Sequence, residues 1–156
     1  MTPIAANDPF VGAWQLQPEL SDYEFGAPPV EGLYTIRARD DSYLFDIGWK
    51  TADNHSFSAD FSGIPDGKQY PYEDLQVAEA VSFTRVDDLT LDSETFKGGN
   101  RIAHARRELL KGGRVMRITQ SGRTPDGMDF SNVSYYPPAG LKTVAGERLV
   151  PFACSI

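Results

Sequence analysis

The alternation of apolar and polar residues is the sequence feature that most constrains the fold. Apolar side chains occupy every second position in many short runs, among them Tyr34, Ile36 and Ala38, Tyr43, Phe45, Ile47 and Trp49, and Phe57, Ala59 and Phe61. A β-strand points successive side chains to opposite faces, so this period of two predicts strands with one buried face. No long stretch has the 3.6-residue period of a helix, and at most one helical turn fits between residues 18 and 23.

Clusters of Gly, Asp, Asn and Pro separate these runs at intervals of about 8–12 residues, which is typical of an all-β barrel or sandwich. We expect strands at residues 10–17, 31–39, 42–50, 55–62, 76–86, 90–97, 101–110, 114–121 and 128–136. Consecutive hairpins favour a meander closed into a barrel, because closure removes exposed strand edges. The sequence therefore predicts an all-β fold, a single antiparallel up-and-down β-barrel of about 8–10 strands.

The whole chain, residues 1–156, is expected to form one domain, since its length is close to the ~150 residues of an average domain. The barrel spans about residues 8–136. An extended C-terminal tail, residues 137–156, contains several Pro and Gly residues and is expected to wrap the outside.

Composition excludes several classes of function. The net charge is −7 and no basic cluster occurs, so a nucleic-acid partner is not expected. No run approaches the ~18 apolar residues of a membrane span. Residues 1–8 have neither a basic nor an apolar signal region, which predicts a cytoplasmic protein, or a periplasmic one if the chain starts at a mature N-terminus.

The single cysteine, Cys154, excludes an internal disulfide and a multi-cysteine metal site. The two histidines, His55 and His104, have no metal-ligand spacing, so no metal is expected. Neither a Walker loop nor a dinucleotide glycine fingerprint occurs, and no cofactor is expected.

Register arguments predict which side chains face the interior. If residues 40–41 form a two-residue hairpin turn, Ile36 faces Phe45 and Tyr34 faces Ile47 on one apolar face. A one-residue slip would mix apolar with charged side chains, so the segregation supports this pairing.

A second hairpin around residues 112–113 places Arg107 opposite Ile118, on an otherwise apolar inner face. On its outer face, Glu108 pairs with Arg117. A buried guanidinium is costly unless acceptors or an anion satisfy it. Two interpretations remain open: Arg107 is a structural arginine paired inside the protein, or it anchors a ligand carboxylate or other oxyanion.

His55 alternates with Phe57 and is expected to point inward near a barrel rim, either as a partly solvated residue or as an acid–base group. His104 falls on the outer face beside Ser121 and is the weaker candidate.

The candidate ligand-binding residues share an expected inward orientation; they are Arg107, Tyr34, Tyr43, Phe45, Trp49, His55, Phe57, Phe61, Met116, Ile118 and Gln120. The candidates for catalysis are His55, Tyr34, Tyr43 and Arg107, because a His–Tyr pair beside an arginine could move a proton and stabilise an oxyanion.

An ordered series of motifs resembles the small bacterial lipocalin-like proteins of the calycin superfamily. The series comprises Asp8-Pro9-Phe10-Val11-Gly12-Ala13-Trp14-Gln15-Leu16, Ser21, Gly26-Ala27-Pro28-Pro29, Asp66-Gly67-Lys68 with Tyr70-Pro71, Arg85-Val86-Asp87 with Thr90, Arg107, Met116 with Ile118, and Gly127 with Asn132. The Gly12-x-Trp14 pair resembles the first-strand signature of that superfamily.

The resemblance implies a barrel with a ligand cavity, in which Trp14 closes the floor and an arginine of a late strand packs over it. Eight strands, as in lipocalins, or ten, as in fatty-acid-binding proteins, both remain open.

Three functional hypotheses follow. The first is a monomeric or homodimeric protein that binds a small amphipathic or aromatic molecule in the cavity, acidic if Arg107 is its anchor. The second is a cofactor-independent enzyme, an isomerase, cyclase, lyase or hydrolase, that uses the same cavity. The third, a structural or interaction protein, predicts a barrel filled with side chains.

Overall fold

The computed structural model describes residues 3–5, 7–72, 78–139, 141–143 and 149–151. In chain order the elements are β1 (Gly12–Gln15), the 3-10 turn η1 (Pro18–Leu20), β2 (Asp22–Tyr23), β3 (Glu31–Arg39), β4 (Ser42–Lys50), β5 (Ser56–Gly63), β6 (Asp66–Pro71), β7 (Ala80–Asp87), β8 (Thr90–Lys97), β9 (Asn100–Leu110), β10 (Val115–Arg123), β11 (Asp129–Tyr136), β12 (Leu141–Thr143) and β13 (Leu149–Pro151).

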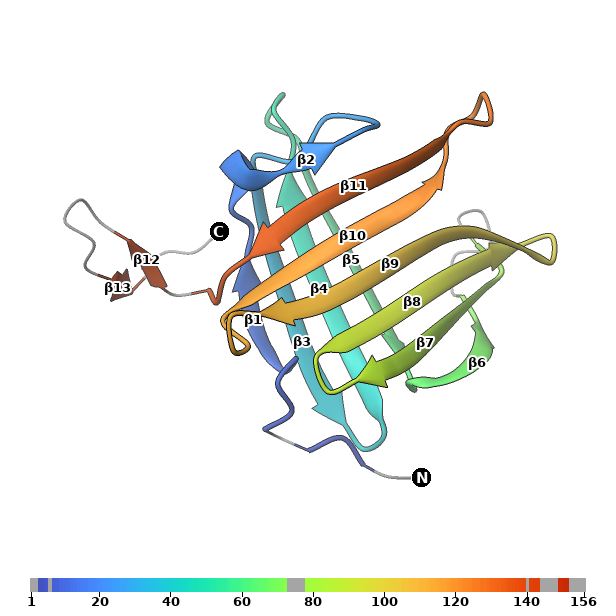
Figure 1. Cartoon of the computed structure of the whole chain (residues 1–156), viewed down its shortest axis with the longest axis horizontal. Helices are drawn as coiled ribbons and strands as arrows, with labels where there is room; N and C mark the ends of the chain where they lie inside the picture. Colours follow the sequence, from blue (N-terminus) through green and yellow to red (C-terminus); the bar gives the residue numbers. More distant parts are fainter. Residues whose placement is uncertain (1–2, 6, 73–77, 140, 144–148, 152–156) are drawn as a thin grey trace.

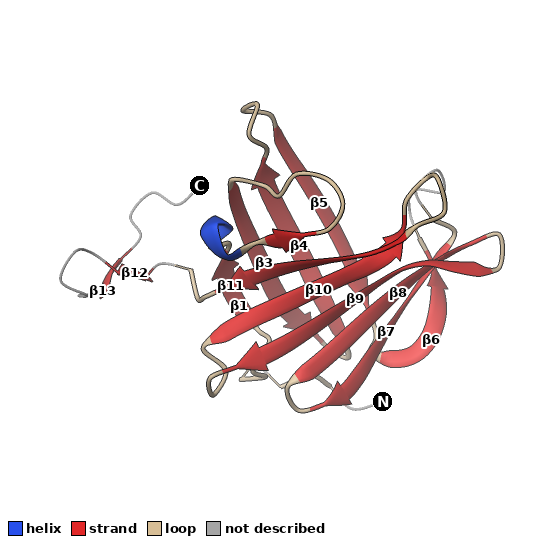
Figure 2. Ribbon diagram, turned by 45° about the horizontal axis from the view of Figure 1, so that its top comes forward, coloured by secondary structure: helices blue, strands red, loops and turns tan. Residues whose placement is uncertain are grey.

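The strands form two curved antiparallel sheets that face each other across the interior (Figures 1 and 2). One sheet has the order β1-β3-β4-β5 and the other β2-β11-β10-β9-β8-β7-β6. Apart from the short β2, the two sheets together contribute ten strands of the described chain to the barrel, 4 from one and 6 from the other. The expected all-β antiparallel barrel is confirmed, at the upper end of its predicted strand number.

Hydrogen bonds join the two sheets beside β1. The Gln15 N–H donates to the carbonyl of Pro137 at 2.8 Å and the Gln17 N–H to that of Tyr135 at 2.9 Å, while Trp14 bridges Pro138. The first residues of the expected tail therefore close the barrel. The next described segments, β12 and β13, pair with each other in a separate hairpin, which Figure 1 shows projecting from the barrel rather than wrapping it. Cys154 lies outside the described residues.

Both registers predicted from the sequence are confirmed. Ile36 pairs with Phe45 and Tyr34 with Ile47 in the β3–β4 hairpin. Arg107 pairs with Ile118 in the β9–β10 hairpin. A one-residue slip would have moved the apolar set to solvent, which is why alternation determines the pairing so strongly.

Strand β6 was missed, because it lacks the alternation on which sequence reasoning depends. Its residues are mostly polar and exposed, and it begins with Asp66-Gly67, a dipeptide typical of turns. Gly67 has a φ of +80°, and the β6–β7 register shifts between Asp66 and Gln69. Asp66-Gly67 therefore does adopt a backbone conformation typical of turns, but here it forms a bulge at the start of an edge strand.

Side chains fill one end of the barrel completely. Its fully buried members come from both sheets and from the segment before β1; they are Phe10, Ile36, Tyr43, Phe45, Phe83, Leu91 and Met116. Three of the rings stack: Phe45 lies 4.9 Å from Phe61 and 5.2 Å from Phe83 between centroids. This end of the interior is a packed core.

A buried polar cluster ties the N-terminal segment across this filled end. Arg85 of β7 donates to a carboxylate oxygen of Asp8 at 2.8 Å, and also to the hydroxyl of Tyr43. The Tyr43 hydroxyl donates to the same Asp8 oxygen at 3.0 Å. Burial, with the negative charge of Asp8, raises the pKa of Tyr43.

Trp14 is 4% exposed, and its indole N–H donates to the carbonyl of Phe10 at 3.1 Å. The arginine that the resemblance implied over Trp14 lies elsewhere. In the described structure Arg85 lies over Phe10, 5.2 Å from its ring centroid, and Arg107 lies over Tyr34 and Phe45. An arginine therefore lies over Phe10, whereas the resemblance implied an arginine over Trp14.

No hydrogen-bonded ladder joins β5 to β6, so this edge of the barrel depends on packing. Phe83 of β7 fills it. A Cβ atom built on Gly63 of β5 would lie 2.0 Å from the Phe83 ring, so only glycine permits this approach. The barrel is closed by hydrogen bonds on one side and by aromatic packing on the other.

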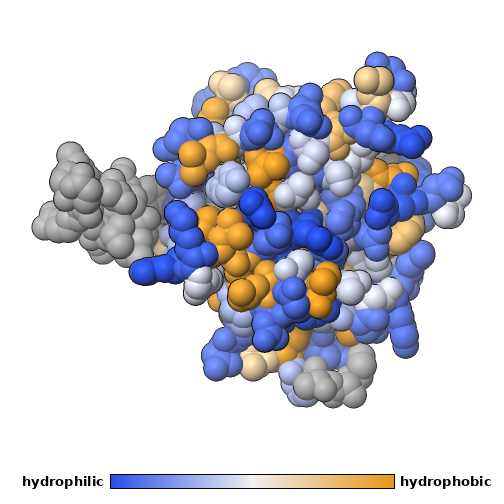
Figure 3. Space-filling model, viewed as in Figure 1, coloured by the Kyte–Doolittle hydropathy of each residue, from blue (hydrophilic) through white to orange (hydrophobic). Residues whose placement is uncertain are grey.

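The outer face of β8–β11 is mostly hydrophilic, with apolar residues scattered singly over it (Figure 3). Arg106 forms a two-pronged pair with Asp92, and Arg117 lies 3.1 Å from Glu108, as the sequence predicted. Within the described part of the chain, no helix is long and apolar enough to cross a membrane. The same part contains no group of three or more potential metal-ligating side chains.

Replacing Gly63 with alanine should destabilise the protein by about 1–3 kcal/mol, the usual effect of overpacking a rigid core. Gly48→Ala on the adjacent strand is the matched control, because its Cβ would meet nothing closer than 3.9 Å. That control should leave stability unchanged or raise it slightly, since alanine restricts the unfolded chain. Chemical denaturation of both variants measures the change. Equal changes in the free energy of unfolding would contradict the close packing of Phe83 against Gly63.

Replacing Trp14 with alanine should lower the free energy of unfolding by about 3–5 kcal/mol, because it leaves a cavity in the core. Leu89→Ala, at a surface position, should change it by less than about 0.5 kcal/mol. Denaturant titration measures both. A Trp14→Ala loss below about 1 kcal/mol would show that this ring contributes little to the core.

Candidate functional site

The other end of the barrel is hollow. It contains a cavity of about 570 Å³, within the range of roughly 300–1,000 Å³ that holds drug-sized molecules. A barrel filled with side chains, which the third hypothesis predicted, is therefore not what the chain forms.

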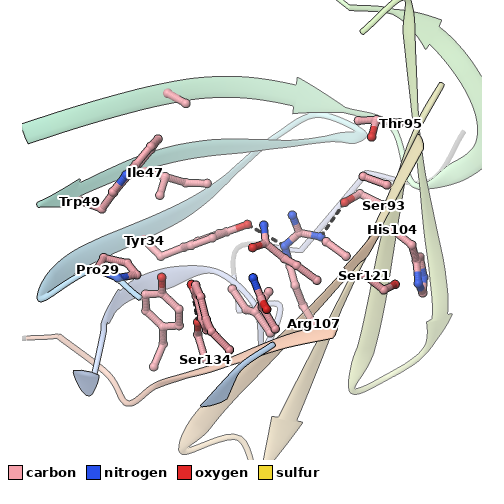
Figure 4. A pocket seen from close by; sticks show the side chains of 18 of the residues that line it. Pro29, Tyr34, Ile47, Trp49, Ser93, Thr95, His104, Arg107, Ser121 and Ser134 are labelled. Carbon is pink, nitrogen blue, oxygen red and sulfur yellow. Dashed lines mark hydrogen bonds between the residues drawn. The ribbon is translucent and has the colours of Figure 1, made fainter. Parts of the chain in front are cut away.

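Arg107 lies where the filled and hollow ends meet, and it is only 2% exposed. Its Nε donates to the Tyr34 hydroxyl at 2.7 Å and its Nη1 to the Ser93 hydroxyl at 3.1 Å (Figure 4). Its guanidinium carbon lies 5.0 Å from the Phe45 ring centroid. The core thus supports the guanidinium from one side, and the cavity lies on the other.

No carboxylate of the described residues lies within 4.0 Å of the Arg107 guanidinium. Its partners are neutral hydroxyls and aromatic faces. Among the described residues, Arg107 is therefore paired inside the protein by hydroxyls rather than by a carboxylate. A hydroxyl that accepts a hydrogen bond keeps its own hydrogen to donate, so Tyr34 and Arg107 both present donors.

Tyr136 of β11 adds a second phenol to this region. Its ring centroid lies 5.6 Å from that of Tyr34, and it lines the cavity. Burial raises the pKa of Tyr136, the neighbouring Tyr34 and Tyr23 raise it further, and Arg107 acts in the opposite direction. The Tyr136 hydroxyl therefore remains a neutral donor over the physiological pH range.

The two walls of the cavity differ in polarity. The wall from β4 and β5 is apolar and consists of Ile47, Trp49, Ala59 and Phe61. The facing wall, from β8 to β11, contributes most of the hydrogen-bonding side chains: Ser93, Thr95, Arg107, Gln120, Asn132, Ser134 and Tyr136. Figure 4 shows Ile47 and Trp49 on one side of the space and Ser93, Arg107 and Ser134 across from them.

Of the candidate ligand-binding residues, the structure brings six to the cavity: Tyr34, Trp49, Phe61, Arg107, Ile118 and Gln120. Tyr43, Phe45 and Met116 also point inward, but they belong to the filled end. Phe57 is half exposed at the rim, stacked on Trp49 at 5.7 Å between centroids. Alternation within these strands predicts which side chains point into the barrel. It does not predict which end of the interior is filled with side chains.

The inward orientation predicted for His55 is wrong. Its side chain is 71% exposed, and its Nδ1 lies 2.9 Å from a carboxylate oxygen of Asp53. His55 precedes β5, which begins at Ser56, so the alternation of the strand does not extend to it. Of the four candidates for catalysis, Tyr34 and Arg107 are hydrogen-bonded at the cavity, whereas His55 and Tyr43 are not among the residues that line it.

His104 pairs with Ser121, as the register predicted, and its Nε2 lies 3.2 Å from a carboxylate oxygen of Asp92. Burial opposes ionisation of Asp92, but hydrogen bonds from Arg106 and His104 hold its pKa below the ordinary value. His104 and Ser121 are also among the residues that line the cavity (Figure 4).

Sequence reasoning missed two groups of cavity residues. The first is the segment from the end of β2 to β3, which contributes Tyr23, Phe25, Ala27 and Pro29. The second is the polar side of β8 and β11, which contributes Ser93, Thr95, Asn132, Ser134 and Tyr136. Their strands had been located correctly, and the alternation of Asn132, Ser134 and Tyr136 was available as a signal. Serine and asparagine at inward positions do not stand out unless a cavity is assumed.

No protein-family model matches the sequence, and no curated protein sequence matches it. The structure is similar to a crystal structure of zebrafish ileal bile acid-binding protein complexed with cholic acid, with a TM-score of 0.54 and 15% sequence identity. The match covers 84% of this chain and 99% of that chain. At this identity the likeness shows the fold alone: an antiparallel β-barrel like that of the bile acid-binding protein.

Raising the pH should leave Tyr136 protonated beyond the ordinary tyrosine pKa of 10.0 as long as the protein stays folded. Because its folded pKa is raised, its contribution to stability is complete below about pH 10 and is lost as the pH rises further. Tyr136→Phe should therefore lose less stability than the parent protein above about pH 10. Denaturation at several alkaline pH values tests this, and parallel losses would contradict it.

Proposed function

We propose that the protein binds a small amphipathic acid inside the barrel, with the acid group at Arg107 and the apolar body against Trp49 and Phe61. The observation that carries this proposal is the buried Arg107 guanidinium, which contacts only hydroxyls and rings among the described residues. Burying a cation without an anion is unfavourable, and a bound carboxylate would compensate its charge.

The donors around Arg107 are suited to an anion. Tyr34 can donate its hydroxyl hydrogen while accepting from Arg107, and Tyr136 stays neutral. Hydrogen bonds to a charged acceptor are stronger than neutral ones, and a guanidinium matches the geometry of a carboxylate.

The different polarity of the two walls supports an amphipathic rather than a purely apolar ligand. Apolar surface on one side would be buried against Ile47 and Phe61, while hydroxyl or carbonyl groups on the other would meet Ser93 and Gln120. The zebrafish protein of similar fold was crystallised with cholic acid, itself an amphipathic acid, which agrees with this ligand class.

The proposal is tested with cis-parinaric acid, a fluorescent carboxylic acid, and its methyl ester. Arg107→Met should weaken binding of the acid about tenfold or more, because a hydrogen bond to a charged group contributes about 1.5–3 kcal/mol. The ester should bind the parent and the variant alike. Fluorescence titration gives both dissociation constants.

Arg106→Met is the matched control: Arg106 is the neighbouring arginine, on the outer face, and pairs with Asp92. This variant should leave the affinity for the acid unchanged. Equal affinity of the parent and Arg107→Met for cis-parinaric acid would show that Arg107 is not the anchor. Failure of the parent protein to bind either probe would count against the proposed function itself.

A further inference from the structure

We propose that Asn132 acts as a latch that holds a strap of the chain, residues 23–29, against the cavity, and that opening of this latch sets the rate of ligand exchange. The inference rests on the proposed function, and it concerns how a ligand passes in and out.

The strap forms part of the cavity wall. Tyr23, Phe25, Ala27 and Pro29 all line the cavity, so every second residue of the strap contributes to the lining. The strap begins at β2, where Tyr23 pairs with Asn132 of β11. The same register, continued by two residues, brings Phe25 to Phe130, and their ring centroids lie 5.2 Å apart.

Asn132 is buried, with 8% of the residue exposed. Its side-chain amide forms hydrogen bonds with the backbone of the strap. Its Oδ1 accepts from the Glu24 N–H at 2.9 Å and from the Phe25 N–H at 3.1 Å. Its Nδ2 donates to the Phe25 carbonyl at 2.9 Å. Strand β2 ends at Tyr23. At Glu24 and Phe25, the Asn132 side chain forms hydrogen bonds with the strap backbone in place of the backbone pairing of a longer strand.

Beyond this latch the strap has few other attachments. Among the described residues, positions 26–29 make no backbone–backbone hydrogen bond, and the next one joins the Val30 N–H to the Lys50 carbonyl at 2.8 Å. Gly26 has a φ of +81°, and Pro28 and Pro29 have no N–H to donate. With Asn132 released, the strap would still be held to β11 at its start, where the Glu24 carboxylate accepts from the Ser131 N–H at 2.7 Å and the Tyr23 hydroxyl lies 3.3 Å from that of Ser134. From Phe25 to Val30 it would lose its hydrogen bonds to β11.

The other break in the hydrogen bonding, between β5 and β6, is less suited to passage at the depth of the core. Phe83 fills it, fully buried and in close contact with Gly63. Opening there would require unstacking Phe83 from Phe45 and Phe61. Opening the strap breaks the hydrogen bonds to Asn132, the bond from the Ser131 N–H to the Glu24 carboxylate and the ring contact of Phe25, but it unstacks no ring of the filled end.

The first test replaces Asn132 with alanine and measures stopped-flow kinetics of cis-parinaric acid. Both the association and the dissociation rates should rise about tenfold, while the dissociation constant changes by less than about threefold, because the latch acts on opening rather than on the bound ligand. Hydrogen exchange at the Glu24 and Phe25 amides should accelerate in the same variant, with or without a ligand.

Gln120→Ala is the matched control, since Gln120 is the Cα partner of Asn132 on β10 and lines the same cavity. It removes an amide without touching the strap, so the exchange of those two amides should stay unchanged. A second variant, Phe25→Cys with Phe130→Cys in a Cys154→Ser background, should slow both ligand rates at least about tenfold when oxidised. Reduction should restore them.

A loss of affinity in Asn132→Ala without faster kinetics would overturn the latch and make Asn132 a ligand contact. Unchanged kinetics in the oxidised double-cysteine variant would overturn it in favour of the β5–β6 gap. Failure of the parent protein to bind the probe refutes the proposed function and, with it, the role of the strap in ligand exchange. Slow amide exchange in Asn132→Ala would refute the latch even if binding is normal.

Discussion

The burial of Arg107 is the constraint on which the rest of the interior depends. A guanidinium in a barrel of this size cannot be surrounded by apolar side chains alone, because losing its hydration is costly without polar partners. Tyr34 and Ser93 supply two hydroxyls, and the rings of Tyr34 and Phe45 lie against its faces. Arg107 therefore lies at the boundary, with packed rings behind it and open space in front.

Packed side chains occupy the filled end of the barrel, where the two sheets contact each other directly. The stacked rings of Phe45, Phe61 and Phe83 form a rigid base, and Gly63 allows the sheets to meet where no ladder joins them. On the other side, β1 bonds to the residues that follow β11. Packing and hydrogen bonding thus close opposite sides of the same barrel, and neither closure needs side chains in the cavity.

The two walls of the cavity differ in polarity because the strands of the two sheets differ in composition. The β3–β4–β5 sheet contributes long alternating runs rich in aromatic residues, and these make one apolar wall. Strands β8 to β11 place serine, asparagine and glutamine at many of their inward positions, and these make the other wall. The strap joins the sheets over this space and is anchored to the polar wall through Asn132.

Alternation and turn chemistry in the sequence determine much of this fold. They specified the all-β class, the β3–β4 and β9–β10 registers and the inward position of Arg107, because a period of two leaves no freedom once one face is buried. They could not specify β6, whose polar residues do not alternate, or the exposure of His55, which precedes its strand.

Only the tertiary structure decided which inward residues are core and which are cavity wall. Tyr43 and Phe61 show the same alternation in sequence, yet one is enclosed at the filled end and the other borders open space. That difference depends on how far each layer lies from the closed end and on which side chains of the opposite sheet reach it. These are long-range distances, and a local pattern of residues does not contain them.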